Sequence, residues 1–428
     1  MTVGKNFGRR LRAMGSVAES TGDQSSFTLA FVGLCIFTFA IVTFRLPVAE
    51  LGIVVGAVGL LLQRETLRAP AMVWWLAALV VWGFVASQFA PYTENSPTQL
   101  TLAAKLLAIL FLAVNALRTP RQIHYFLIFF VGCFLAYPAR GTLSNYFLYD
   151  YTTFGRALWN YAYANSNDLA AMSLLAIGAA LAVSFSNSGK KFCKVFAAVS
   201  AVVFVFVVLL TQSRGGFIGL LAGFGPAAVS LLRKRKKGRF FVIPALLLVL
   251  LLTPADVWKR LSGIGELTST ETIARADTEG SAEQRWKIQT VGLDIFGDHA
   301  FWGVGLGGYG AANSIYAPDL GARDTHNTYL NIAAETGWPG LLLWGGMIIS
   351  ALRSGGRRGT SAPSFALQSE AAWVRRGLVA FLVAGLFGTY AYQSFTFLMM
   401  AALWSYAAAS KLEDSVSQPQ RLRNGRGR

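Results

Sequence analysis

The chain has little charge for its length. Only 14% of its 428 residues are Asp, Glu, Lys or Arg, whereas 54% are hydrophobic, and the mean hydropathy is +0.47. A water-soluble protein of this size rarely has such a composition. The scarcity of charge therefore excludes an ordinary soluble multidomain enzyme and favours an integral membrane protein.

Cysteine and histidine are also scarce, with three of each. Cys35, Cys133 and Cys193 fall in or beside apolar runs, so they show no pairing pattern for disulfides. The loops expected on the outer side contain no Asp-x-Asp pair, and the histidines do not occur at the spacing of a metal site. We therefore expect neither a metal nor a cofactor.

Apolar runs recur from Phe27 onward, and they approach the length of a membrane span. A hydrocarbon core about 30 Å thick requires roughly 20 helical residues. The sequence thus predicts an all-α, polytopic integral membrane protein with about 12 transmembrane helices. The predicted spans are 27–44, 46–62, 70–88, 100–117, 122–138, 161–185, 193–211, 215–232, 239–253, 328–352, 374–388 and 392–410.

The 38 basic residues indicate how these spans are oriented. If the N-terminus is inside, most of them fall on the inner side. We therefore expect residues 1–26 and 411–428 to be cytosolic tails. Orientation explains the net charge of +17 better than nucleic-acid binding does, and it also explains the Arg233–Arg239 cluster.

One polar segment, residues 254–327, separates transmembrane residues 27–253 from transmembrane residues 328–410. We expect it to form a long outer loop with amphipathic helices. Its apolar spacing predicts a helix over 281–296, and Ser281 with Gln284 is typical of a capping box, which places Arg285 in the first turn. The string 303–310 resembles a GxGxxG motif, but it lacks a βαβ context and is interpreted as a flexible surface turn.

A helix break is expected directly after this segment. Gly337 followed by Pro339 is typical of one helix ending and another beginning. The run from Pro339 to Ala351 would rise only about 20 Å, so we expect the short helix before it to add membrane depth. His326 would then lie at the membrane interface, either as a functional group or as an ordinary surface imidazole.

Three outer positions combine polarity with membrane proximity: Arg214, Arg285 and His326. Arg214 is followed by two glycines that permit close backbone approach to a ligand, although a snorkelling arginine at a helix end is the simpler interpretation. Two guanidinium groups and an imidazole together indicate binding of a phosphate or diphosphate with proton transfer. No role can be separated for His299 or Lys105.

A fourth polar region, residues 161–168, begins the sixth predicted span. Tyr163, Asn165 and Asn167 are suited to hydrogen-bonding sugar hydroxyls. They are equally suited to an aromatic belt at the membrane interface and to a helix cap.

The order of these motifs resembles the O-antigen ligase and polymerase family of bacterial envelope glycosyltransferases. His326-Asn327, nine residues and then Gly337-Trp338-Pro339-Gly340 is similar to the family's His–(Asn/Ser/Gln)–x9–Gly–x–x–Gly signature. Ser213-Arg214-Gly215 resembles its Ser-Arg-Gly element. The arginine helix with its glycine turn, and the amide-rich start at Asn165, have counterparts as well.

The resemblance implies a GT-C-like enzyme in the bacterial inner membrane with its active site facing the periplasm. It implies an undecaprenyl-diphosphate-linked donor, with Arg214 and Arg285 holding the diphosphate and His326 as the base in an inverting, metal-independent transfer. Asn165, Asn167, Tyr163 and Asn327 would contact substrate, whereas Gly337, Pro339 and Gly340 would shape the site. The implied acceptor is lipid A-core.

Several alternatives stay open at this point. Polymerisation, with a second lipid-linked repeat unit as acceptor, and O-glycosylation of protein share the same signature. A polysaccharide transporter or flippase would require ionisable groups at mid-bilayer, for which only Lys105, Glu50 and Asp168 qualify.

Overall fold

The computed structural model describes residues 27–63, 66–187, 189–234, 281–354 and 362–425, with isolated positions between 243 and 258. Four expectations lie wholly or largely outside these residues. They are the tail 1–26, the cluster Arg233–Arg239 beyond Lys234, the span 239–253 and the part of the outer loop before residue 281.

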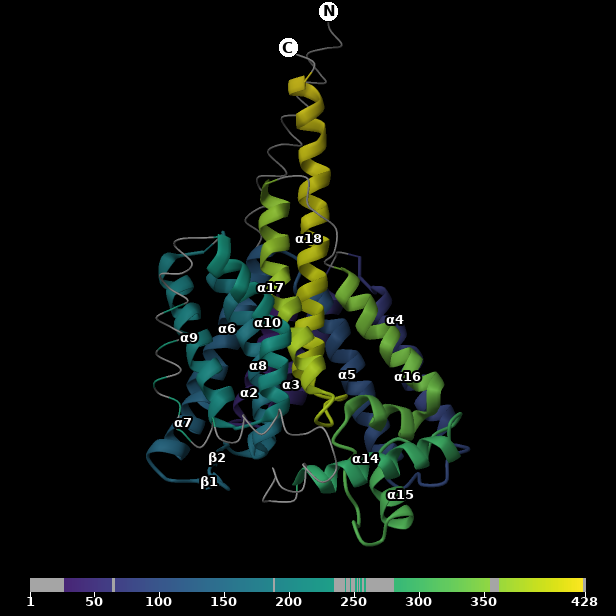
Figure 1. Cartoon of the computed structure of the whole chain (residues 1–428). Helices are drawn as coiled ribbons and strands as arrows, with labels where there is room; N and C mark the ends of the chain where they lie inside the picture. The colour runs from purple at the N-terminus through teal and green to yellow at the C-terminus, as the bar shows by residue number, and fades with distance from the viewer. Residues whose placement is uncertain are drawn as a thin grey trace, which may run out of the picture.

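The described residues form a helical bundle with one short hairpin, which confirms the all-α fold class (Figure 1). The first half consists of α2 (Leu29–Thr43), α3 (Ala49–Leu62), α4 (Ala71–Ala86), α5 (Ser96–Ala116), α6 (Pro120–Phe134), the π-helix η1 (Leu135–Ala139), α7 (Arg140–Phe147), β1 (Thr152–Thr153), β2 (Arg156–Ala157) and the 3₁₀ turn η2 (Tyr161–Tyr163). The second half consists of α8 (Ser166–Ser184), α9 (Lys191–Leu210), α10 (Arg214–Lys234), α14 (Ser281–Asp298), α15 (Tyr309–Tyr316), α16 (Thr328–Ser354), α17 (Ala362–Ala384) and α18 (Ser394–Gly425).

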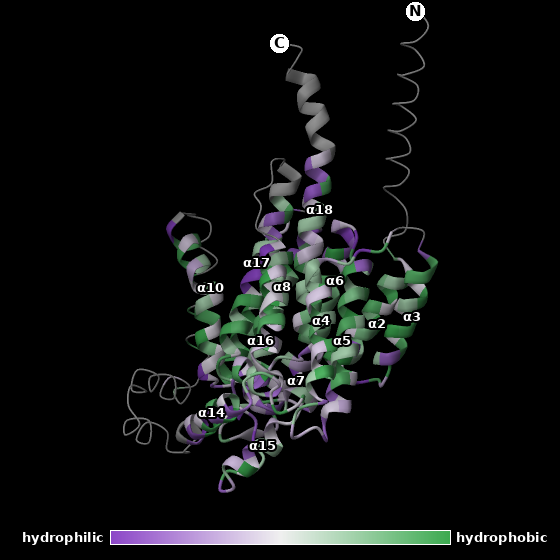
Figure 2. Ribbon diagram, turned by 90° about the vertical axis from the view of Figure 1, so that its right-hand side faces the viewer, coloured by the Kyte–Doolittle hydropathy of each residue, from purple (hydrophilic) through white to green (hydrophobic). Residues whose placement is uncertain are grey.

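Within the described part of the chain, five helical stretches are long and apolar enough to cross a membrane: α5, α6 with its continuation through α7, α8, α9 and α10. Three shorter apolar helices, α2, α3 and α4, accompany them. Figure 2 shows hydrophobic residues along the bundle helices and more hydrophilic ones around α14 and α15. The chain is thus a multi-pass membrane protein, and the count of twelve spans stays a prediction.

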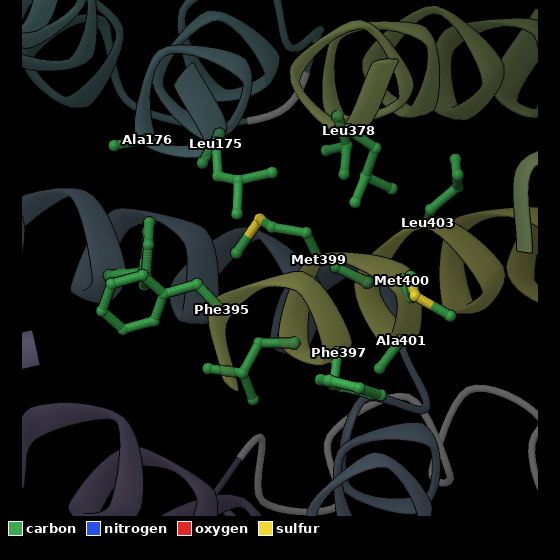
Figure 3. Close-up of a cluster of buried hydrophobic side chains, with 14 of the residues drawn as sticks. Leu175, Ala176, Leu378, Phe395, Phe397, Met399, Met400, Ala401 and Leu403 are labelled. Atoms are coloured by element: carbon green, nitrogen blue, oxygen red, sulfur yellow. The ribbon is translucent and has the colours of Figure 1, made fainter. Parts of the chain in front are cut away.

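The core of the bundle lies between α8, α17 and α18 (Figure 3). Leu175 of α8 and Leu378 of α17 lie beside Met399 of α18, and all three are about 1% exposed. Gly178 and Gly377 let α8 and α17 approach closely, because a Cβ on Gly178 would lie 2.8 Å from the Cα of Gly377. Small residues at such contacts are typical of helix packing in membranes.

The boundaries differ from the sequence prediction at three helices. Helix α8 begins at Ser166 and not at residue 161, because η2 and the Asn165 cap precede it. Helix α17 begins at Ala362, well before the predicted 374, and α18 runs to Gly425, well past the predicted 410. The apolar pattern marks only the part of each helix that contacts core or lipid, so polar extensions escape it.

Helices α14 and α15 lie at one end of the bundle, together with α7 and the β1–β2 hairpin (Figure 1). We call this the site end. Helix α14 confirms that a helix lies at the expected place, and it begins at Ser281. The C-terminal part of α18 extends from the opposite end.

Candidate active site

The predicted break in α16 is present at Gly337. Its φ of 68° and ψ of −177° interrupt the helix, and Pro339 follows. A Cβ on Gly337 would collide with the carbonyl group of Phe301, so glycine is required by both conformation and space. At Gly340, a Cβ would collide with the Thr336 side chain. The three residues predicted to shape the site thus define where α16 bends.

His326 lies two residues before α16, half-buried and with a φ of 50°. This left-handed conformation is uncommon for a residue with a side chain. It is enclosed by a local hydrogen-bond ring, in which Thr325 Oγ1 donates to Asn327 O (2.9 Å) and accepts from Asn327 N (3.2 Å). The ring fixes the backbone on both sides of His326 next to the start of α16.

The surroundings of His326 favour the neutral form of its imidazole. Burial lowers its pKa from the ordinary 6.5, and the positive charges of Arg285 and Arg323 lower it further, whereas Asp324 acts in the opposite direction. Arg285 in α14 and His326 are therefore electrostatic neighbours. A neutral imidazole is the form that accepts a proton.

Arg214 is the first residue of α10 and is half-buried. Its Nε is buried without a hydrogen-bond partner among the described residues. Ser213 precedes it and donates from Oγ to Asn167 Oδ1 (2.9 Å). That same oxygen accepts from Arg156 Nη2 (2.8 Å), so Asn167 links two arginine-bearing segments.

The loop 385–393 contacts the starts of both α10 and α16. Thr328 donates from N to Gly385 O (2.8 Å) and from Oγ1 to Gly388 O (2.7 Å). On the other side, Gly215 lies so close to Phe387 that a Cβ would lie 2.6 Å from the Phe387 Cβ. Helix α10, which begins at Arg214, and helix α16, which follows His326, therefore both pack against this loop.

Tyr390 in this loop reports which charges surround it. Burial raises the pKa of its phenol well above 10, and the negative charge of Asp168 adds to the effect, whereas Arg285 and Arg156 oppose it. Asp168 in turn interacts electrostatically with Asp324, beside His326. Charged residues from α8, the hairpin and α14 thus act electrostatically on one buried tyrosine at the site end.

Three predicted substrate contacts have structural partners instead. Tyr163 is fully buried and donates its hydroxyl to Val42 O (3.0 Å), so it is a core residue, and its contact with substrate stays a prediction. Asn165 Oδ1 caps α8 by accepting from Asn167 N (2.8 Å). Asn327 Oδ1 caps α16 by accepting from Tyr329 N (3.0 Å). Contacts of the two asparagines with substrate stay predictions.

The glycine string is packed and is not a free surface turn. Gly303, Gly305 and Gly307 all have positive φ, and the turn lies against α16 and the residues before α5. Ser96 Oγ donates to Leu306 O (3.0 Å), and Tyr92 N donates to Val304 O (3.1 Å). Lack of side chains here permits close packing, not flexibility.

Residues 199–345 match the family model described as O-antigen ligase. The chain carries an O-antigen ligase family domain. This domain includes Arg214, Arg285, His326 and the α16 break, so the match confirms the resemblance that those motifs carried. No curated protein matches the chain.

Arg156 was missed by the sequence reasoning, and it lies before the matched O-antigen ligase domain. It follows the hairpin turn formed by Phe154 (φ 53°) and Gly155 (φ 70°). Its Nε donates to Thr211 O (2.9 Å), which aims the guanidinium at Asn167. The only signal in the sequence is an arginine directly after a glycine turn, and that pattern is too common to identify a site.

Proposed function

We propose that this protein is a membrane glycosyltransferase. It moves a glycan from an undecaprenyl-diphosphate-linked donor to an acceptor hydroxyl on the periplasmic face of the bacterial inner membrane. The preferred reaction is O-antigen ligation, with lipid A-core as acceptor. One observation carries the proposal: the match of residues 199–345 to the O-antigen ligase family, which includes Arg214, Arg285 and the half-buried His326.

Arg214 and Arg285 are assigned to the diphosphate. Guanidinium groups bind phosphate oxygens through pairs of charge-assisted hydrogen bonds, and they keep their charge at every physiological pH. The half-buried Arg214, whose Nε has no partner among the described residues, is suited to this role. Positive charge there stabilises the diphosphate as it leaves, which a metal would otherwise do.

His326 is assigned as the general base. The acceptor oxygen attacks the anomeric carbon while the bond from that carbon to the diphosphate oxygen breaks, and undecaprenyl diphosphate departs with the electron pair. The proton of the acceptor hydroxyl passes to the imidazole. Attack opposite the leaving group inverts the anomeric centre, in a GT-C-like arrangement that needs no metal.

The periplasmic orientation rests on the basic residues of the sequence. The short loops expected on the inner side carry the excess of Lys and Arg, and such loops are cytosolic in most membrane proteins. Both termini would then be cytosolic.

The transporter alternative is weakened by one contact. Lys105 and Glu50, two of the ionisable residues that it requires, pair with each other at 3.1 Å, and both are exposed on the helices. Polymerisation of repeat units and O-glycosylation of protein use the same site chemistry, so the acceptor must be determined directly.

The test supplies purified protein with an undecaprenyl-diphosphate-linked glycan and one acceptor at a time, in the presence of a chelator. The acceptors are lipid A-core, a second lipid-linked glycan and a periplasmic protein. We expect glycosylated lipid A-core and free undecaprenyl diphosphate. Product only with the second glycan or with protein would reassign the acceptor. Absence of undecaprenyl diphosphate release in every arm would refute transferase function.

A further inference from the structure

The break in α16 removes helical hydrogen bonds, and other parts of the chain replace them. Ala334 O accepts from Val304 N (2.9 Å), Glu335 O from Gly305 N (3.1 Å) and Thr336 O from Trp82 Nε1 (2.8 Å). Within a regular helix these carbonyls would bond residues 338, 339 and 340, but residue 339 is a proline without an N–H. The break therefore serves as an attachment point for the turn that follows α14.

The side chain of Glu335 strengthens this attachment. It is only 6% exposed, and its carboxylate interacts with the backbone N–H groups of Gly307 and Tyr309 and with the Asn331 side chain. The positive φ values of the glycines allow successive N–H groups to converge on one anion. A buried carboxylate is costly unless it is bonded in this way, and the proposed transfer chemistry makes no use of it.

The turn contacts α14 as closely as it contacts α16. Tyr309 donates its hydroxyl to Ile288 O (3.0 Å), one helical turn from Arg285. Ile288, Ile295, Val304, Tyr309 and Ala334 form one buried apolar cluster. Helix α14 also packs directly on α16, where a Cβ on Gly292 would lie 2.8 Å from Leu330 Cδ2. The turn thus adds a second link between the helix that carries Arg285 and the helix that His326 precedes.

We infer that Glu335 is a positioning residue, which clamps the turn 303–309 to the α16 break and so sets the separation of Arg285 from His326. The inference rests on the proposed function, because it assumes that both residues act on one substrate. Misplacement of reacting groups by about 1 Å can reduce rates 100-fold. Donor binding should suffer less, since Arg214 lies on a different helix.

The test compares Glu335→Leu and Glu335→Gln with a matched control, Glu370→Leu. Glu370 is a second buried carboxylate and is 2% exposed. It accepts a hydrogen bond from Ser186 Oγ (2.7 Å), and Ser186 follows the end of α8 that lies away from the site. Three quantities are measured on each protein: amide hydrogen exchange in peptides covering 303–309, donor affinity, and single-turnover transfer.

In Glu335→Leu we expect exchange in the turn to rise at least tenfold and transfer to fall about 100-fold, with a donor affinity loss several times smaller. Glu335→Gln keeps one acceptor oxygen, so its exchange in the turn and its transfer rate should lie between those of Glu335→Leu and wild type. Glu370→Leu should leave exchange in the turn and transfer unchanged.

Unchanged exchange and transfer in Glu335→Gln would overturn the inference even if Glu335→Leu cannot be purified in folded form. An equal loss of transfer in Glu370→Leu would overturn it as well, because the effect would then be general destabilisation. Failure of the proposed function looks different: the wild-type protein would transfer no glycan, whereas the exchange measurement would still report on the clamp.

Discussion

Replacing Gly337 by alanine tests whether the α16 break is required. Gly337 has a φ of 68°, where an L-residue costs about 1–2 kcal/mol. The new Cβ would also press on the Phe301 carbonyl group. The neighbouring bond from Trp338 N to Ala300 O (2.8 Å) would weaken, at a cost of about 1 kcal/mol. The total is about 2–3 kcal/mol.

A matched control lies on the same helix beyond the break. A Cβ on Gly345 would meet nothing within 4 Å. Because alanine is favoured over glycine inside a helix by about 1 kcal/mol, Gly345→Ala should be neutral or stabilising.

The assay is the apparent melting temperature in detergent, together with single-turnover transfer. Gly337→Ala should melt earlier than wild type and lose more transfer than its folded fraction explains, because the bend positions His326. Equal melting and equal transfer in Gly337→Ala and Gly345→Ala would refute the requirement for the bend.

Three further predictions concern the charged groups and the core. Burial and Arg285 lower the pKa of His326 below 6.5, so the transfer rate should stay level down to pH 6.5 and fall only at lower pH. In Arg285→Gln, the residual transfer rate should begin to fall at a higher pH than in wild type. A wild-type rate that already falls above pH 6.5 would contradict this. Arg214→Ala should weaken donor binding by about 1.5–3 kcal/mol with partial recovery in Arg214→Lys, whereas full recovery by lysine would show that only charge matters. Tyr163→Phe removes one buried hydrogen bond, so it should cost about 1 kcal/mol of stability without changing donor affinity. A weaker donor affinity would identify Tyr163 as a substrate contact.

Local sequence signals predicted the parts of the site that local physics determines. Gly337 with Pro339 predicted the break, and the apolar spacing from Ser281 predicted α14. Both depend on residues within a few positions of each other, for which backbone conformation and helix periodicity are sufficient guides.

Long-range contacts were out of reach. Trp82 bonds Thr336 across 254 positions, and Arg156 reaches Asn167 through a hairpin with no recognisable motif. Tyr163 resembles an interface tyrosine by sequence, yet it packs among Phe44, Phe134 and Trp159. Which face a tyrosine presents depends on the assembled bundle, so its burial could not be predicted from its neighbours in sequence.

The most direct test of the central claim separates donor binding from chemistry in His326→Ala. Its matched control is His299→Ala, because His299 also follows α14 but lies near the Tyr316 hydroxyl (3.4 Å). Donor affinity and single-turnover transfer are measured on the same purified proteins. The account predicts that His326→Ala binds the donor and transfers it about 100-fold or more slowly, whereas His299→Ala transfers normally. Transfer at the wild-type rate by His326→Ala would contradict it.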